Sequence, residues 1–349
     1  MKKVQSGNDI SAYQAGKIKA IALLSGGLDG TLAAAIVKRA GVEVIGLHLQ
    51  TLFDTERESS HYLAQVAKGL GIKVRTVDLS EEQVEVVRHP KHGYGAGVNP
   101  CIDCRIMMLQ AAKRVMEEQE AQFVITGEVL GQRPMSQHLN SLTQIAKESG
   151  LGDRLLRPLS ANLLADSLPV VEGWVKREDL LSLQGRGRKE QIELAEELGI
   201  RDYPQAAGGC LLVSKAYTAR LRDAFAHIGK DEMTYDDFKI LKHGRHFRLS
   251  ERVKVIAGRD EGENAILSEY VAGRTIIEPR DTVGSLVLVE GDPSLEELTL
   301  AARLAARYSD HKTGDDVAMC IKKPSDKEET VSVEPLSPED ERIDEWRID

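Results

Sequence analysis

Strand-like apolar runs and amphipathic helical stretches alternate along the first two hundred residues of the chain. Four runs have the length of buried strands, and they lie at residues 20–24, 42–49, 73–77 and 123–126. Helical patterns stand between or after them at residues 32–39, 59–70, 81–87, 102–118 and 187–198. Repeated alternation of this kind predicts an open parallel sheet with helices on both faces, and such sheets bind ligands at the carboxyl ends of their strands. We therefore expect an α/β domain over residues 17–215, preceded by an N-terminal arm at 1–16.

The pattern changes after Cys210. Helices are expected at 216–227 and 295–308, and strands at 245–256 and 283–289. This mixture predicts a smaller α+β domain over residues 218–323. Residues 324–349 are charged, contain proline and have Trp346 as their one aromatic residue, so we expect an acidic flexible tail there.

The net charge of −9 argues against general attraction to nucleic acid. Residues 1–215 are near neutral and the acidic excess lies beyond them, so an RNA contact would need a local basic patch. The apolar runs fall far short of the ~20 residues that a membrane span needs, and residues 1–3 are followed by polar residues rather than an apolar signal sequence. We expect a cytoplasmic protein without membrane contact, in which cysteines serve metal or redox chemistry rather than disulfides.

A glycine-rich turn, Ser25-Gly26-Gly27-Leu28-Asp29-Gly30, joins the first strand to its helix. Its glycines allow backbone N–H groups to point at an anion, and the helix N-terminus adds partial positive charge at the same place. The turn lacks the lysine of a Walker loop. Asp29 is a candidate ligand for Mg²⁺, which would offset its repulsion of phosphate. A plain strand-to-helix turn is the alternative interpretation.

This turn resembles the S-G-G-x-D-S signature of the PP-loop ATP-pyrophosphatases, with Gly30 in place of the usual serine. The resemblance implies a Rossmann-like parallel sheet of the adenine nucleotide alpha hydrolase (HUP) type and a site for ATP. Thr31 is a candidate substitute for the missing hydroxyl. The ATP-binding residues implied are Ser25, Gly26, Gly27, Leu28, Asp29, Gly30, Thr31 and Gly127.

Three cysteines form a second candidate site. Cys101 and Cys104 make a C-x-x-C at the start of a helix, where the helix dipole is expected to lower the pKa of both thiols. Cys210 follows two glycines. Three cysteines can hold a 4Fe–4S cluster with one open iron, or act as a nucleophile and persulfide pair, or form a zinc clip or core thiols. Cys320 lies in an apolar strand pattern and is expected to be inert.

Further segments resemble tRNA thiolases. Residues 126–132, 155–159 and 187–192 resemble ThiI-type tRNA 4-thiouridine synthases. The Asn-Pro-Cys at residues 99–101, followed by Cys104, resembles the MnmA-type 2-thiouridylases, and the three cysteines resemble the pattern of iron–sulfur-dependent tRNA thiolases. These resemblances cover residues 17–215 and imply catalytic roles for Asp29, Cys101, Cys104 and Cys210. THUMP and rhodanese-like domains of ThiI have no counterpart here, which favours a cluster or free sulfide as sulfur carrier.

Basic residues gather in the second domain, where an alternating strand at residues 245–255 would place several cations on one face. An ordinary solvated face is the alternative. Residues 246–249 and 256–264 resemble the RNA-binding domain of NFACT proteins, which implies a tRNA-holding module over about residues 220–322. The candidate RNA contacts are Lys239, Lys242, Arg245, Arg248, Arg252 and Lys254.

Together these observations predict a tRNA thiouridine synthase that adenylates a uracil oxygen and then replaces it with sulfur. Its expected cofactors are ATP and Mg²⁺, a 4Fe–4S cluster stays open as the sulfur carrier, and its partners are tRNA and a sulfur donor, either sulfide or a persulfide carrier. A homodimer stays open. Two alternatives also stay open: a PP-loop ligase or sulfur transferase acting on a small molecule, and a non-catalytic RNA-binding protein, which Gly30 motivates.

Overall fold

The computed structural model describes residues 17–54, 59–201, 203, 209–312, 314–325 and 328–348. The chain divides into two compact units, one formed by residues 1–95 and 100–209 and the other by residues 96–99 and 210–349. The expected N-terminal arm at residues 1–16 lies outside the described residues. Among the described helices, none combines the length and the apolar character needed to cross a membrane.

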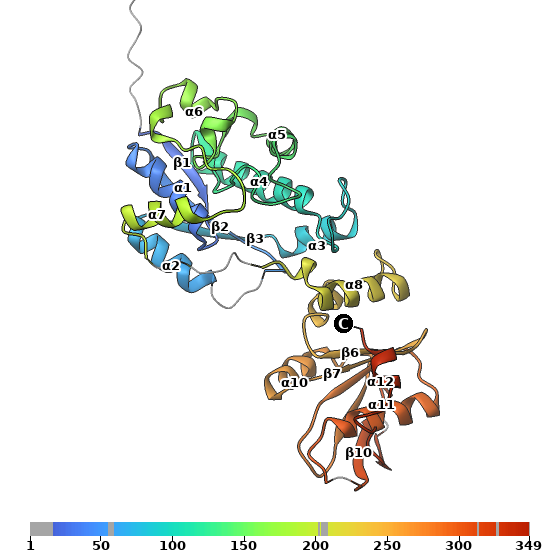
Figure 1. Ribbon diagram of the computed structural model, residues 1–349. Coiled ribbons are helices and arrows are strands. Elements are labelled where there is room, and N and C mark those ends of the chain that lie inside the picture. The colour runs from blue at the N-terminus through green and yellow to red at the C-terminus, as the bar shows by residue number, and fades with distance from the viewer. Residues whose placement is uncertain are drawn as a thin grey trace, which may run out of the picture. The chain divides into compact units, whose positions relative to one another are not determined.

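The first unit is built around a parallel sheet of five strands in the order β3-β2-β1-β4-β5. Figure 1 labels β1, β2 and β3 of this sheet. Its strands are β1 (Lys19–Leu23), β2 (Glu43–Gln50), β3 (Val74–Asp78), β4 (Phe123–Ile125) and β5 (Leu155–Leu156). Its helices are α1 (Leu28–Arg39), α2 (Ser59–Leu70), α3 (Ser80–Arg88), α4 (Cys101–Glu118), α5 (Leu139–Glu148), α6 (Leu168–Val171) and α7 (Lys189–Glu197). The predicted Rossmann-like α/β fold is therefore confirmed.

Alternation along β1 divides the core of this unit into two layers. Ala20 and Ala22 pack with α1, α2 and α7 on one face of the sheet. Ile21 packs with α4 and α5 on the other face. Because side chains of a strand alternate between its faces, an unbroken apolar run in β1 is what a sheet covered on both sides requires.

The second unit holds an antiparallel sheet of six strands in the order β11-β10-β8-β9-β7-β6. Its strands are β6 (Arg245–Ser250), β7 (Val253–Ala257), β8 (Thr275–Pro279), β9 (Val287–Glu290), β10 (Val317–Lys322) and β11 (Glu328–Val333). Its helices are α8 (Lys215–His227), α9 (Tyr235–Ile240), α10 (Glu261–Leu267), α11 (Leu295–Arg307) and α12 (Arg342–Trp346). One face of the sheet packs on α11, and the other contacts α9 and α10. The predicted α+β character is confirmed.

Two expectations about this unit are wrong. The single strand expected at residues 245–256 is a hairpin of β6 and β7, which turns at Glu251 and Arg252. A flexible tail was expected at residues 324–349, but the described part of this segment is folded, because β11 pairs with β10 along its whole length. The tail also contributes Val333, Leu336 and Ile343 to the core beside α11, so burial offsets the high charge of the segment.

Candidate nucleotide and sulfur-transfer site

A cleft of about 140 Å³ opens in the first unit where β1 and β4 end. In the sheet, β2 and β3 lie on one side of β1, and β4 and β5 lie on the other. The strand order therefore reverses between β1 and β4. Such a switch point is where open parallel sheets bind ligands. The glycine turn and residues 126–128 meet at this cleft, which Ser25, Gly27, Leu28, Asp29, Gly30, Thr126, Gly127 and Glu128 line.

Backbone conformation at the cleft depends on two glycines. Gly26 has a φ of 80°, in the left-handed region that L side chains rarely adopt. Gly127 has no positive φ, but a Cβ there would lie 2.4 Å from the carbonyl carbon of Asp29 and from the N atom of Gly30. Gly127 therefore allows the segment after β4 to pack directly against the first turn of α1, which leaves the helix N-terminus facing the cleft.

Asp29 is held in the first turn of α1 by a neighbour that sequence reasoning did not assign. Gln132 Nε2 donates a hydrogen bond of 3.0 Å to Asp29 Oδ2. The other oxygen, Oδ1, is buried and has no hydrogen-bond partner among the described residues. A buried carboxylate oxygen without a donor is suited to a hard cation such as Mg²⁺, so the donor set fits the expected ion.

The hydroxyl of Thr31 and the space around Gly30 both bear on the serine that the family signature has at position 30. Thr31 is buried, and its Oγ1 donates to the carbonyl oxygen of Gly27 at 2.9 Å, so this hydroxyl is not a free substitute for the missing serine. At Gly30, a Cβ would lie 3.1 Å from the carbonyl oxygen of Leu23. A serine would therefore crowd β1 unless the backbone moved by a few tenths of an ångström. Neither Thr31 nor Gly26 lines the cleft.

A buried carboxylate connects the cleft with the C-x-x-C helix. Glu128 is 2% exposed, and its two oxygens contact two guanidinium groups: Arg105 Nε lies 3.2 Å from Oε1, and Arg157 Nε lies 2.8 Å from Oε2. Thr126 Oγ1 donates to Oε2 at 3.1 Å. Burial alone would raise the pKa of Glu128, but Arg157 and Arg105 hold that pKa below its ordinary value.

Three arginines line the cleft together with the glycine turn, namely Arg105, Arg133 and Arg188. They outnumber the two carboxylates, Asp29 and Glu128, so the cleft favours a polyanion. Sequence reasoning missed all three arginines, although Arg133 directly follows the segment at residues 126–132 that resembles ThiI, and Arg188 lies inside the one at 187–192. Arg105 directly follows Cys104, and this proximity to the cysteine motif was the one feature of the sequence that could have indicated its place at the cleft.

Cys101 is the first residue of α4, and Cys104 follows one turn later. Gln83 Nε2 donates to Cys104 Sγ at 3.5 Å. Burial raises the pKa of the Cys104 thiol to about 11, and the hydrogen bond from Gln83 and the charge of Arg105 only partly oppose this effect. The expected lowering of the Cys104 pKa by the helix dipole is therefore wrong, because loss of solvation is the larger effect.

Asp103, which lies between the two cysteines, connects the first turn of α4 to the preceding loop through polar contacts with His92. His92 Nδ1 lies 2.6 Å from Asp103 Oδ1, and the backbone N–H of His92 donates to Oδ2 at 2.9 Å. Glu148 on α5 contacts the other ring nitrogen of His92 at 3.2 Å. Hydrogen bonds from Lys91 and Gln144, together with one from His92, lower the pKa of Glu148 to about 2, although burial acts in the opposite direction.

The remaining cysteines lie in the second unit. Cys210 is half-buried and comes just before a short turn at Leu211–Val213. Because Cys101 and Cys104 belong to the first unit, the gathering of all three sulfurs stays a prediction. Among the described residues, no group of three or more His, Cys, Asp or Glu side chains is arranged to hold a metal ion. Cys320 lies on β10 as expected, although it is half-buried rather than fully buried.

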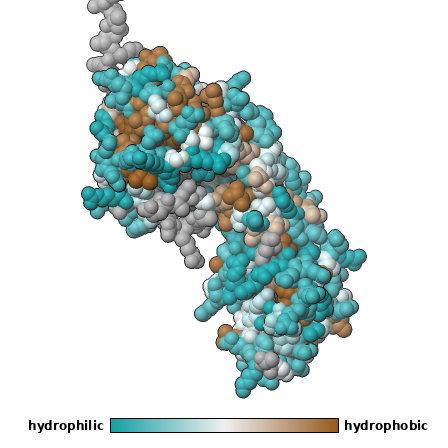
Figure 2. Space-filling model, in the orientation of Figure 1, coloured by the Kyte–Doolittle hydropathy of each residue, from teal (hydrophilic) through white to brown (hydrophobic). Residues whose placement is uncertain are grey.

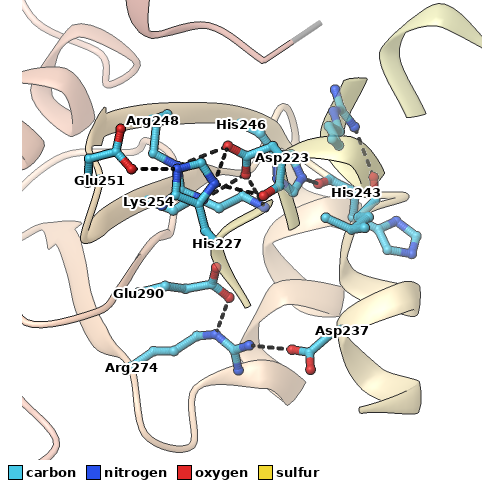
Figure 3. A network of polar contacts seen from close by, with 12 residues as sticks. Asp223, His227, Asp237, His243, His246, Arg248, Glu251, Lys254, Arg274 and Glu290 are labelled. Carbon is cyan, nitrogen blue, oxygen red and sulfur yellow. Dashed lines mark hydrogen bonds and ion pairs between the residues drawn. The ribbon is translucent and has the colours of Figure 1, made fainter. Parts of the chain in front are cut away.

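Two of the predicted RNA contacts lie in an internal ion-pair cluster (Figure 3). Arg248 donates to both oxygens of Asp223 on α8, at 3.0 and 2.7 Å. Lys254 Nζ lies 3.5 Å from the same carboxylate, and the Lys254 side chain is 3% exposed. Burial lowers the pKa of Lys254, and RNA cannot reach its ammonium group in this position. Arg248 and Lys254 therefore connect the β6–β7 hairpin to α8 instead of forming an external basic face.

The other predicted RNA contacts differ in exposure. Arg245 donates to the carbonyl oxygen of Gly258 at 3.3 Å and lies over the Tyr308 ring, 4.6 Å from its centroid. Lys239 is half-exposed and pairs with Asp236 at 3.3 Å, while Lys242 is partly exposed. Arg252, in the hairpin turn, is exposed. The visible face of this unit is mostly hydrophilic (Figure 2), so Arg252, Lys239 and Lys242 stay candidate contacts.

Two family models match the chain. Residues 15–162 match the family described as thiamine biosynthesis protein (ThiI). Residues 244–347 match the NFACT protein RNA binding domain. The first match contains the glycine turn, the C-x-x-C helix and the residues that line the cleft except Arg188, and the second contains the antiparallel sheet.

Curated relatives resemble the chain over part of their length. A probable tRNA sulfurtransferase of Thermococcus kodakarensis is 30% identical over 142 residues, which are 40% of this chain and 36% of that protein. The tRNA-specific 2-thiouridylase MnmA of Xanthobacter autotrophicus is 27% identical over 259 residues, covering 67% of this chain and 62% of that protein. The chain thus spans between about a third and two thirds of these relatives.

Among solved structures, a 4-thiouridine synthetase in complex with RNA and bound ATP is 22% identical, with a TM-score of 0.36. The likeness covers 52% of this chain and 51% of that one. The chain therefore joins a segment that matches the ThiI family to a segment that matches the NFACT protein RNA binding domain.

Proposed function

We propose that the chain is an ATP-dependent tRNA sulfurtransferase, which adenylates a uracil oxygen and then replaces it with sulfur. The main support for this proposal is that the C-x-x-C helix and the glycine turn both contribute residues to the same cleft. Arg105, the residue after Cys104, lines that cleft together with Ser25, Asp29 and Gly30. The match to ThiI over residues 15–162 and the names of the curated relatives support the same assignment.

The proposed reaction has two displacements. In the first, the uracil carbonyl oxygen attacks the α-phosphorus of ATP, and the bond to the β-phosphate oxygen breaks to release pyrophosphate. In the second, sulfide attacks the carbon that carries the adenylated oxygen, and the carbon–oxygen bond breaks to release AMP. Activation is needed because a uracil oxygen is a poor leaving group, whereas AMP is a good one. With sulfide as donor, the sequence needs no oxidant or reductant.

The residues of the cleft bind and orient the nucleotide in this proposal. Backbone N–H groups of the glycine turn and the N-terminus of α1 face the phosphates, and the cleft arginines offset their charge. Asp29, fixed by Gln132 through one oxygen, would hold Mg²⁺ through the other. A bound magnesium ion would supply further charge neutralisation on the phosphates.

Sulfur delivery is assigned to Cys101, Cys104 and Cys210, which would bring the donor sulfur to the adenylated uracil, so loss of Cys210 should stop the second displacement and spare the first. The first unit contains two of the four cysteines of the chain, so a cluster held by three thiolates would need Cys210 from the second unit. No step of the proposed reaction is therefore routed through a cluster. A persulfide on one of these cysteines is the alternative donor. Transfer from it would leave a disulfide with a second cysteine, which an external thiol would have to reduce.

The second unit is proposed to hold the tRNA. Its match to the NFACT RNA-binding domain supports this role, as do the exposed Arg252 and the partly exposed Lys239 and Lys242. Because contacts between cations and phosphates release counterions from the RNA, this binding should weaken with added salt.

A direct test incubates the chain anaerobically with unmodified tRNA, ATP, Mg²⁺ and sulfide, followed by mass spectrometry of the digested nucleosides. We expect thiouridine to form when ATP is present and not when it is omitted. Asp29→Asn should lower the rate by roughly 100-fold, because the buried anionic oxygen is lost from the phosphate site. The control Asp153→Asn changes an exposed aspartate of the same unit and should have no effect.

Each alternative has its own outcome in this test. Pyrophosphate release with a small acceptor, but no sulfur in tRNA, would indicate a small-molecule ligase or sulfur transferase. Binding of tRNA with no pyrophosphate release under any condition would indicate a non-catalytic RNA-binding protein. Either result would refute the proposed sulfurtransferase activity.

A further inference from the structure

Arg105, the residue after Cys104, makes an ion pair and lines the cleft. Its Nε pairs with the buried Glu128 at 3.2 Å, and its side chain is 26% exposed at the cleft. Among the described residues, its terminal nitrogens have one polar contact, in which Nη1 lies 3.9 Å from Met108 Sδ. The guanidinium is therefore anchored at one edge, while its terminal N–H groups are available to an anion.

Glu128 is itself fixed by a second arginine. Arg157 is 7% exposed, donates to Glu128 at 2.8 Å and donates through Nη2 to the carbonyl oxygen of Leu142 at 3.0 Å. Arg157 thus neutralises Glu128 from the interior, and Arg105 pairs with it from the cleft side. This arrangement holds Arg105 in one orientation before any ligand binds, which lowers the entropic cost of an anion contact.

We infer that Arg105 binds the phosphate groups of the nucleotide or the released pyrophosphate, and that Glu128 is the positioning residue that holds its guanidinium at the cleft. This inference deepens the proposed function and rests on it for the identity of the nucleotide. A guanidinium is suited to the task because its planar fork can donate two parallel hydrogen bonds to phosphate oxygens. Since Arg105 follows Cys104 on α4, the same helix turn carries the phosphate contact and the thiol.

The test is titration calorimetry of the full chain with inorganic pyrophosphate, ATP and adenosine. Arg105→Ala should weaken binding of pyrophosphate and of ATP by about 10- to 100-fold, the loss expected for charge-assisted hydrogen bonds, and leave adenosine binding unchanged. Arg105→Lys should recover part of the affinity, because it restores the charge without the fork. The matched control is Arg114→Ala, which removes an exposed arginine of the same helix and should match the wild type.

Glu128→Gln tests the positioning role, because it keeps the shape of the side chain but removes its charge. It should weaken pyrophosphate binding and spare adenosine binding, whereas a general loss of structure would weaken both. Thermal unfolding of each variant verifies folding, and Arg105→Ala should fold because Glu128 keeps Arg157 as a partner.

Two results would overturn the inference. One is equal pyrophosphate affinity in Arg105→Ala and Arg114→Ala, and the other is a wild-type chain that does not bind pyrophosphate at millimolar concentration. The measurement uses neither tRNA nor sulfide. A chain that binds pyrophosphate through Arg105 but never forms thiouridine would therefore refute the proposed function and leave this inference standing.

Discussion

Individual residues at the cleft show what residue type and order can predict. Eight residues were predicted to bind ATP, and all of them except Gly26 and Thr31 line one cleft. Those of the glycine turn could be found because a turn between a strand and a helix has a local pattern of glycine and small polar residues, whereas Gly127 was found through the resemblance of residues 126–132 to ThiI. Their contact with ATP stays a prediction.

Other residues depend on contacts that are distant in sequence. Arg105 and Glu128 are 23 positions apart, and nothing in their local patterns indicates that they pair. Lys254 follows the basic pattern of its strand, yet its ammonium group lies beside Asp223, 31 positions earlier. A charged residue is predicted to be exposed by default, so a buried ion pair cannot be recognised until both partners are placed.

Cys104 provides a prediction about pH. Because its pKa is raised to about 11, its thiol should stay protonated at neutral pH and react slowly with iodoacetamide. In a variant with the other three cysteines changed to serine, the labelling rate should rise about tenfold per pH unit from pH 7 to 10. A rate that levels off near the ordinary thiol pKa of 9.0 would contradict the burial of this sulfur.

At the scale of helices and strands, the spacing of apolar residues and the residues typical of turns predicted the positions of most elements of the first unit. The strands β1 to β4 and helices α1 to α4 lie where the apolar pattern placed them. The second unit was harder, because β6 and β7 are joined at Glu251 and Arg252 with no glycine, proline or asparagine to mark the turn. The C-terminal segment was wrongly expected to be flexible, because it has many charged residues and only a few apolar residues, which complete the core.

The junction between β4 and α1 gives a prediction at this scale. Gly127→Ala places a methyl group where the backbone of Asp29 and Gly30 already lies, so the loop after β4 must shift away from α1. We expect ATP affinity to fall by at least about tenfold, with the 1–3 kcal/mol loss of stability typical of overpacking. Calorimetric titration with ATP and thermal unfolding measure the two effects.

Gly69→Ala is the matched control, because its added methyl group has no neighbour within 4 Å. It should leave ATP affinity unchanged and hold or slightly raise stability, since alanine favours a helix more than glycine does. Equal ATP affinity in Gly127→Ala and Gly69→Ala would show that the contact between β4 and α1 does not shape the nucleotide site.

For the whole molecule, the three cysteines predicted to handle sulfur belong to different units. Cys101 and Cys104 belong to the unit with the parallel sheet, and Cys210 belongs to the unit with the antiparallel sheet. Sequence order could associate the three cysteines through resemblance to a family pattern, but it could not place them in space. The account assigns ATP chemistry to the first unit, RNA binding to the second, and sulfur transfer to cysteines of both.

Adenylation and sulfur transfer are proposed to be successive steps of one reaction on tRNA. Measuring pyrophosphate and thiouridine in the same samples tests this order, using the wild type, Cys210→Ser and the control Cys320→Ser. We expect one pyrophosphate per thiouridine in the wild type and in Cys320→Ser, and pyrophosphate without thiouridine in Cys210→Ser. Thiouridine formed by Cys210→Ser at the wild-type rate, or equal losses in both variants, would refute the proposed order.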